Sequence, residues 1–116
     1  MKYICLVYAE PGALSGLGPE EKTALDRDSL AYDAKLTRDG HFLAASALQG
    51  VGTARTVRVR RGKRLVTDGP FAETKEVLCG FIFIEAADAD EALRIAEGIP
   101  MARYGTIEVR PELDIG

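Results

Sequence analysis

The sequence is poor in the side chains that bind transition metals. It contains one histidine and two cysteines among 116 residues, which is too few for a four-ligand zinc site. Cys5 and Cys79 lie in or beside apolar runs, and an apolar setting raises the pKa of a thiol. We therefore expect both cysteines to be reduced packing residues. A thiol nucleophile is disfavoured because no activating base lies near either of them in the sequence.

Long apolar runs are also missing. None approaches the roughly 18 residues that a helix needs to cross a bilayer, so we expect no membrane-spanning segment and no membrane partner. The first residues, MKYICLVYAEPG, pass from apolar to acidic without the small-residue cleavage site of a secretory signal. The sequence therefore predicts a cytoplasmic protein.

The charge balance disfavours a nucleic-acid-binding protein. The net charge is -3, with 47% hydrophobic and 28% charged residues, which is typical of a soluble globular protein. A mildly acidic chain is a poor partner for nucleic acid. The length fits one domain spanning residues 1–116, and the sequence contains no internal repeat, low-complexity tract or interdomain linker.

The first half of the chain predicts a strand followed by a long helix. Residues 2–9, KYICLVYA, are β-branched and aromatic with almost no polar break, which is typical of a strand covered on both faces. After a loop over residues 10–18, Pro19 suits the first helical position, and Gly40 is expected to end the helix in the left-handed conformation. One apolar stripe is formed by Leu25, Ser29, Tyr32 and Leu36, and five charged residues lie mostly away from it: Asp26, Arg27, Asp33, Lys35 and Arg38.

The second half predicts further strands and a short helix. Residues 41–48 form a candidate strand, residues 54–67 a hairpin with valine and arginine alternating, and residues 80–86, GFIFIEA, a very apolar strand. A short helix with an Asp88 cap is expected to face inward with Ala89, Ala92, Leu93 and Ala96, and to end at Gly98 and Pro100. Residues 105–111 close the chain as a strand with Ile107 and Val109 on one face.

This order of elements predicts an α+β fold. Without the inserted β-hairpin it reads βαββαβ, the ferredoxin-like plan, which has an antiparallel sheet and both helices on one face. Residues 2–9 and 80–86 are apolar on both faces of their strands, so the face without helices also needs a cover. An identical subunit is the simplest cover, and we expect a homodimer.

Three segments resemble one known family. The runs DGPFAETKE (68–76), LCGFIFIEA (78–86) and ARYGTIEVRP (102–111) are similar to the YCII-related family, and specifically to its DGPF branch. The resemblance covers nearly the whole chain. It implies a dimeric α/β barrel in which two sheets pack face to face, a fold shared with muconolactone isomerases and small monooxygenases. Members are often encoded beside extracytoplasmic sigma factors.

The sequence departs from the catalytic pattern suggested for better-studied YCII members, a histidine and aspartate pair. His41, the single histidine, starts the second expected strand instead of preceding the first helix, so no catalytic histidine is carried over. Tyr104 stands in the ARYG segment where many related sequences have a histidine. Both departures weaken an imidazole-based mechanism.

The DGPFAETKE run has two interpretations. Asp68, Gly69 and Pro70 are good turn residues, so the run can be a rigid connection that anchors Phe71 in the core. Alternatively, its ionisable residues line a cleft between the sheet and the hairpin, where they share a proton or hold a polar ligand. The candidates for that cleft are Asp68, Glu73, Lys75 and Glu76.

Other polar residues also have two interpretations. His41 can be a general base, but a half-exposed packing role is favoured. The basic run at residues 55–64 can contact phosphate, but a solvated strand face that discourages edge pairing is favoured. Arg103 and Tyr104 can reach a cleft and orient an anion, or they can cap the preceding helix.

Two functions from different classes follow. The first is a small enzyme without metal or organic cofactor that performs acid-base chemistry on a polar or aromatic small molecule. In it Asp68 accepts a proton, Lys75 or Arg103 holds an anionic group, and Tyr104 donates a hydrogen bond. The second is a non-catalytic module that binds a metabolite or a protein, with a link to sigma-factor regulation implied by the resemblance.

Overall fold

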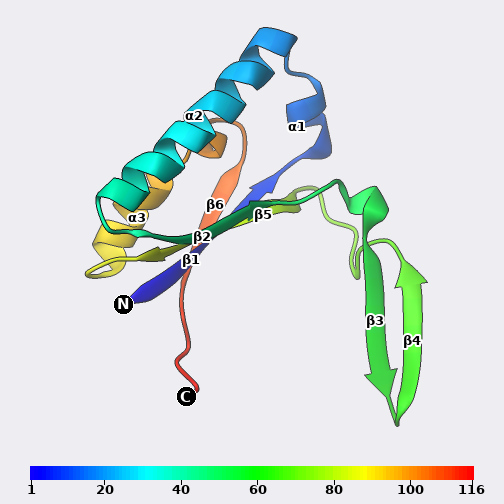
Figure 1. Ribbon diagram of the computed structural model, residues 1–116. Helices are drawn as coiled ribbons and strands as arrows, with labels where there is room; N and C mark the ends of the chain where they lie inside the picture. Colours follow the sequence, from blue (N-terminus) through cyan, green and yellow to red (C-terminus); the bar gives the residue numbers. More distant parts are fainter.

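The computed structural model describes all 116 residues. Two sheets, three α-helices and two short 3₁₀ helices follow one another along the chain (Figure 1). The elements are β1 (Lys2–Ala9), α1 (Pro11–Ser15), α2 (Pro19–Arg38), β2 (Phe42–Ala47), η1 (Val51–Thr53), β3 (Arg55–Arg60), β4 (Lys63–Asp68), β5 (Val77–Glu85), α3 (Ala89–Glu97), η2 (Pro100–Arg103) and β6 (Thr106–Pro111).

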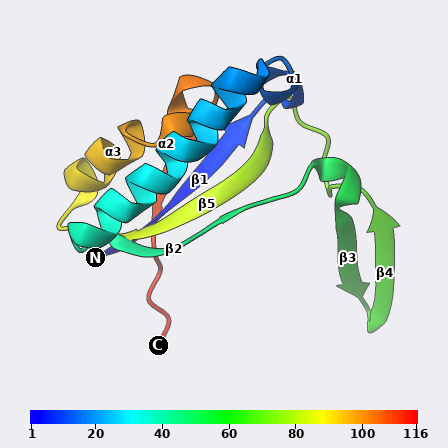
Figure 2. The same cartoon turned by 45° about the horizontal axis from the view of Figure 1, so that its top comes forward.

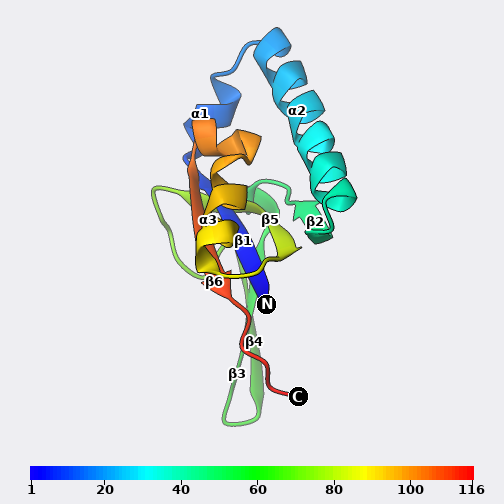
Figure 3. The same cartoon turned by 90° about the vertical axis from the view of Figure 1, so that its left-hand side faces the viewer.

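The central sheet has four antiparallel strands in the order β2-β5-β1-β6. Helices α2 and α3 both lie over one face of this sheet, and no helix lies over the other (Figures 1 and 3). The predicted α+β class is confirmed, and the order of strands and helices is consistent with the ferredoxin-like plan.

Helix α2 begins and ends as the sequence predicts. Pro19 occupies its first turn together with two glutamates, where negative charge is favourable. At the other end, Gly40 has a φ of 81°, and the amide of His41 donates to the carbonyl of Leu36 at 2.8 Å. This is the hydrogen bond that closes a Schellman motif. No helix in the structure combines the length and the apolarity that crossing a membrane requires.

Two local expectations were wrong. The segment expected to be a loop contains the short helix α1, which begins at Pro11. In α3, Asp88 accepts a hydrogen bond from the Glu91 amide at 2.9 Å, as a capping residue should. Of the residues expected to face inward, however, Ala89 is exposed and Leu93 is 54% exposed, and Ile95 points inward instead. The helix is rotated so that branched Ile95 fills the space over the sheet.

The core lies between the helices and the covered face of the sheet. Alternate residues of β1 and β5 are fully enclosed there, with Cys5 and Ile84 at 0% exposure, and Leu36 of α2 packs into the same cluster. Only 15 of the 116 residues are buried in the single chain. The opposite or open face is also apolar but only partly buried, and it consists of Ile4, Leu6, Tyr8, Phe81 and Phe83.

Strands β3 and β4 form a separate two-stranded antiparallel sheet, here called the arm (residues 55–68). It projects away from the central sheet on the side opposite α2 (Figures 1 and 2). The Gly69 amide donates to the Ala54 carbonyl at 2.7 Å and closes its base. The expectation that Phe71 anchors this region in the core was wrong for the single chain, since Phe71 is 79% exposed.

Candidate functional site

A groove runs between α2 and the covered face of the sheet. It consists of two adjoining cavities of about 500 Å³ and about 580 Å³, each within the size range of small-molecule sites. Residues shared by both cavities show that they are continuous; these are Asp26, Ser29, Ala47, Cys79 and Met101. The lining is mostly apolar, so the groove suits a small molecule with a largely apolar body.

The floor of the groove is formed by small residues of β2 and β5. Ala45, Ala47 and Gly80 line it, and their short side chains leave space beneath the helix. Gly80 is required by close backbone approach, because a Cβ there would lie 2.6 Å from the Ser46 carbonyl oxygen. A larger residue at this position would push β2 away from β5.

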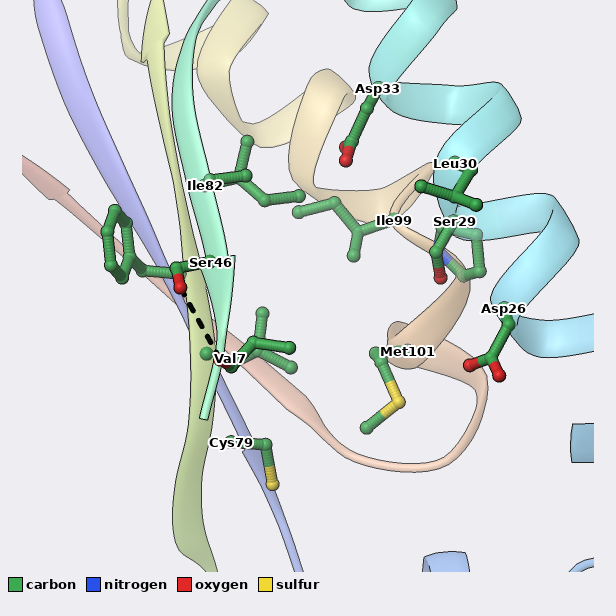
Figure 4. Close-up of a pocket in the computed structure, with 15 residues that line it drawn as sticks. Val7, Asp26, Ser29, Leu30, Asp33, Ser46, Cys79, Ile82, Ile99 and Met101 are labelled. Carbon is green, nitrogen blue, oxygen red and sulfur yellow. Dashed lines mark hydrogen bonds between the residues drawn. The ribbon is translucent and has the colours of Figure 1, made fainter. Parts of the chain in front are cut away.

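The polar groups of the groove come from one face of α2. Asp26, Ser29 and Asp33 follow one another at spacings of three and four residues, which places them on the same side of a helix. Figure 4 shows all three projecting from α2 toward the space above the sheet, with Asp33 on the side of Ile82 and Ile99 and Asp26 on the side of Met101. An apolar floor thus faces a row of hydrogen-bonding groups.

Asp33 differs electrostatically from Asp28 in the same helix and from Asp39 at its cap. Burial raises the pKa of Asp33 above its usual value of 3.8. In contrast, Arg103 lowers the pKa of Asp28 through a hydrogen bond, and Lys35 lowers the pKa of Asp39 in the same way. Asp33 is therefore a carboxyl group in the groove that is suited to carry a proton.

The cysteines offer no nucleophile. Burial raises the pKa of Cys5 to about 11, and burial also raises the pKa of Cys79 at the groove floor. The Cys79 thiol donates to the Val77 carbonyl at 3.4 Å. No group of three or more histidine, cysteine, aspartate or glutamate side chains is placed to hold a metal ion.

The candidates in the DGPFAETKE run lie outside the groove. Asp68 is 91% exposed at the end of β4, where its carboxylate lies 3.5 Å from Arg55. Glu73 is exposed in the loop that follows. Lys75 pairs with Glu10 at 3.3 Å, and the Glu76 carboxylate accepts from the Thr106 hydroxyl at 3.0 Å. Lys75 and Glu76 lie together at one end of the sheet, and Asp68 belongs to the arm.

The other candidates lie at opposite ends of the sheet. His41 is next to β2, and its Nδ1 atom is 2.8 Å from the Glu85 carbonyl. Arg103 pairs with Asp28 of α2 at 3.1 Å and donates to the Pro100 carbonyl at 3.2 Å, so it does hold the short helix η2. Half-buried Tyr104 follows directly. Arg103 does not line the groove, but it contacts Asp28 of α2 and the carbonyl of Pro100, and Pro100 is a lining residue.

Sequence reasoning missed Asp33 as a functional candidate. The stripe of Leu25, Ser29, Tyr32 and Leu36 was expected to face the sheet, and Asp33 was placed away from it. In the structure the inward face of α2 is wider and includes Asp33. The signal was present in the helical spacing of Asp26, Ser29 and Asp33, because Asp26 and Asp33 border the stripe on the side of Ser29.

Comparisons with known proteins agree with this fold. The chain is 38% identical over 113 residues to an uncharacterized protein of Rhizobium meliloti (strain 1021), with 96% of this chain and 91% of that protein covered. It also matches the structure of 5-chloro-2-hydroxyhydroquinone dehydrochlorinase from Burkholderia phenoliruptrix AC1100, solved in complex with 2,5-dihydroxybenzoquinone. That match has a TM-score of 0.60 and 17% identity, and it covers 97% of this chain and 94% of the other.

At this identity the structural match shows a shared fold only. The family comparison is more specific, because the model of the YCII-related domain matches residues 1–115. The chain therefore belongs to the YCII-related domain family.

Proposed function

We propose that this protein is a small enzyme that binds an aromatic or similarly flat small molecule in the groove beneath α2 and transfers protons with Asp33. The observation that carries the proposal is a carboxyl group with a raised pKa in an apolar cavity of about 500 Å³. Titratable groups shifted by burial are common at catalytic sites. A carboxyl group with a pKa nearer neutrality is also a better proton donor and acceptor in turn.

The roles of the groove residues follow from their positions. The Asp33 carboxylate accepts a proton from a substrate hydroxyl or an acidic C–H group, and the resulting carboxylic acid returns a proton to the product. Ser29 and Asp26 hydrogen-bond to polar substituents, while Ile82 and Ile99 contact the ring. Arg103, which hydrogen-bonds to the carbonyl of the lining residue Pro100, suits an anionic substituent. This chemistry needs no metal or organic cofactor.

The structural neighbour supports the substrate class by analogy. That dehydrochlorinase carries a dihydroxylated benzoquinone in its solved complex, a flat ring with polar substituents. The groove of this chain suits such a ligand, because its apolar walls can contact a ring and its few polar groups can bind the substituents.

The DGPFAETKE run further favours the DGPF branch of the family, as expected from its residues.

We also propose that the functional unit is a homodimer. The single chain exposes 8224 Å², whereas a compact protein of 12.5 kDa exposes about 6,200 Å². Its radius of gyration is 16.1 Å against about 13 Å expected for this length. An excess of about 2,000 Å² per chain, about 4,000 Å² for two, is the area that an obligate dimer buries. Pairing of the open faces would cover much of it.

A second candidate function is binding without turnover. The groove contains no nucleophile paired with a base, since burial raises the pKa of the Cys79 thiol. Such a module would sense a metabolite, and regulation alongside a sigma factor belongs to this hypothesis.

The remaining candidates from the sequence stay as hypotheses for a site that a second copy of the chain would complete. They are Asp68, Glu73, Lys75, Glu76, His41 and Tyr104.

The test begins with a thermal-shift screen of hydroxylated benzenes, benzoates and quinones, including 2,5-dihydroxybenzoquinone. A ligand bound by the folded state raises the melting temperature. Each hit is then followed by ultraviolet absorbance for turnover. We expect Asp33→Asn to lower kcat/KM about 100-fold or more while the ligand-induced shift remains.

Asp26→Asn is the matched control, because it makes the same substitution on the same helix face. It should change kcat/KM less than about tenfold, as the loss of one hydrogen bond at an exposed position does. Equal turnover by Asp33→Asn and the native protein would refute the catalytic role of Asp33. Saturable shifts without turnover by any hit would favour the binding module.

A further inference from the structure

The arm is an amphipathic ribbon whose apolar face has no cover in the single chain. The register of β3 and β4 places Val57 directly opposite Val66 and Val59 on the same face, with Arg64 opposite Val59 and the Arg55–Asp68 pair at the base of that face. These three valines are 61%, 42% and 62% exposed, respectively. An isolated two-stranded ribbon is marginally stable in water, so this face requires a packing partner.

The arm projects toward the side of the molecule that a second copy would occupy. In Figures 1, 2 and 3 it runs away from α2 and α3, beyond the open face of the central sheet. The C-terminal segment leaves β6 on the same side, and its Leu113 and Ile115 are 81% and 89% exposed. Apolar groups from three parts of the chain are thus left uncovered on one side.

The charge of the arm is opposite to that of the rest of the chain. Six of the 15 basic residues and one of the 18 acidic residues lie between Arg55 and Asp68, so the arm has a net charge of +5 and the remainder has a net charge of -8. Arg58, Arg60 and Lys63 lie on the basic face opposite the valines, and Arg55 and Arg64 flank the valines on their own face. Because the arm extends away from its own acidic body, the acidic surface that it can reach belongs to another molecule.

We propose that the arm clasps a second copy of this chain, with the face formed by Val57, Val59 and Val66 packed against the partner. This inference rests on the homodimer proposed above and adds the residues that hold it. The valine face supplies apolar burial, and the surrounding arginines complement the acidic body of the partner. A nucleic-acid partner is less favoured, because the strongly acidic body would repel phosphates held by the arm.

Limited trypsin digestion of the full chain tests the proposal, because the arm offers cleavage sites at Arg58, Arg60, Arg61 and Lys63. The dimer dissociation constant is first measured by sedimentation, and digestion is then compared above and below it. We expect cleavage within the arm to be at least tenfold slower in the dimer. The double variant Val57→Thr with Val59→Thr should remove this protection and weaken the dimer at least tenfold.

Leu65→Thr is the matched control, because it removes an apolar side chain of the arm from the opposite face. It should leave both protection and dimer affinity within about threefold of the native values. Circular dichroism and equal cleavage rates of all variants as dilute monomers show that threonine has not unfolded the arm, since threonine keeps a high strand propensity.

Three outcomes would overturn the proposal. If the dimer is stable but trypsin cuts its arm as fast as in the monomer, the homodimer proposal stands and the proposed contact between the arm and the partner is refuted. A single-chain species at micromolar concentration would remove both proposals, without affecting the catalytic role of Asp33. Protection of the arm only after addition of a short DNA duplex would assign the basic face to a polyanion instead.

Discussion

The two faces of the central sheet are both apolar but differ in their surroundings. Cys5 and Ile84 lie under the helices at 0% exposure, whereas Leu6 and Phe81 on the open face are only partly buried. Cys5 and Leu6 are neighbours in sequence, and only the alternation of side chains across a strand separates them. Hydrophobicity therefore indicates that a residue needs cover, and the placement of the helices decides whether its own chain provides it.

The largest effect is expected on the covered face. Ile84→Ala should lower the free energy of unfolding by about 3 kcal/mol, because it opens a cavity in a fully enclosed position. Urea unfolding followed by circular dichroism at a fixed protein concentration measures this loss. The control Leu93→Ala, at a 54% exposed position of α3, should change stability by about 0.5 kcal/mol or less. Equal losses for the two variants would mean that the helices do not enclose Ile84.

A smaller effect on folding but a large one on assembly is expected on the open face. Leu6→Asp should weaken the proposed dimer about 100-fold or more, because an unpaired carboxylate would be buried in the interface. Sedimentation velocity over a concentration series measures this change. Leu93→Asp makes the same substitution on the solvent side of α3 and should leave the dimer intact. An undisturbed Leu6→Asp dimer would show that the open face is not the interface.

The smallest effect is expected in the groove above the covered face. Burial raises the pKa of Asp33, so the folded state favours the protonated carboxyl group. The stabilisation is present below the unfolded pKa of 3.8 and is lost as the pH rises through the folded pKa. Asp33→Asn should therefore raise the melting temperature at pH 7 and leave it unchanged near about pH 3.

Asp28→Asn provides a control of opposite sign. Arg103 lowers the pKa of Asp28, so the ionised carboxylate stabilises the folded state above the unfolded pKa, and this stabilisation is lost as the pH falls through the folded pKa. The substitution should lower the melting temperature at pH 7, and the difference should shrink in acid. Scanning calorimetry at several pH values measures both variants. A shift of the same sign for both would contradict the assignment of Asp33 to a desolvated site.

Local signals predicted much of the fold. Pro19, Gly40 and Asp88 act through hydrogen bonds and dihedral preferences within a few residues of themselves, so their effects can be derived from sequence. Which face of α3 packs on the sheet depends on which side chain fits the space there. For that reason Ile95 is buried, whereas Leu93, which was expected to be, is exposed. The exposed position of Phe71 depends on how the loop after the arm leaves the body, and no short-range pattern encodes it.

The groove was harder to predict than the strands. Its depth comes from small residues on β2 and β5, Ala47 and Gly80 among them, facing a helix that is distant in sequence. Asp33 acquires its raised pKa from that enclosure. The DGPFAETKE run is polar and typical of one branch of the family, but within one chain its side chains lie mostly in solvent or in exposed ion pairs. The sequence shows which residues have reactive or ionisable side chains, but only the folded structure shows which of those side chains lie close together.

The hydrogen bond between Ala54 and Gly69 has a further consequence. The Gly69 amide nitrogen and the Ala54 carbonyl oxygen are 2.7 Å apart, so the chain leaves the central sheet and returns to it at nearly the same place. The length of the segment between these two residues therefore does not affect the position of the central strands. Relatives should therefore tolerate wide variation in length here while the flanking strands keep their register. The base of the arm is a natural place to graft a reporter domain without disturbing the groove.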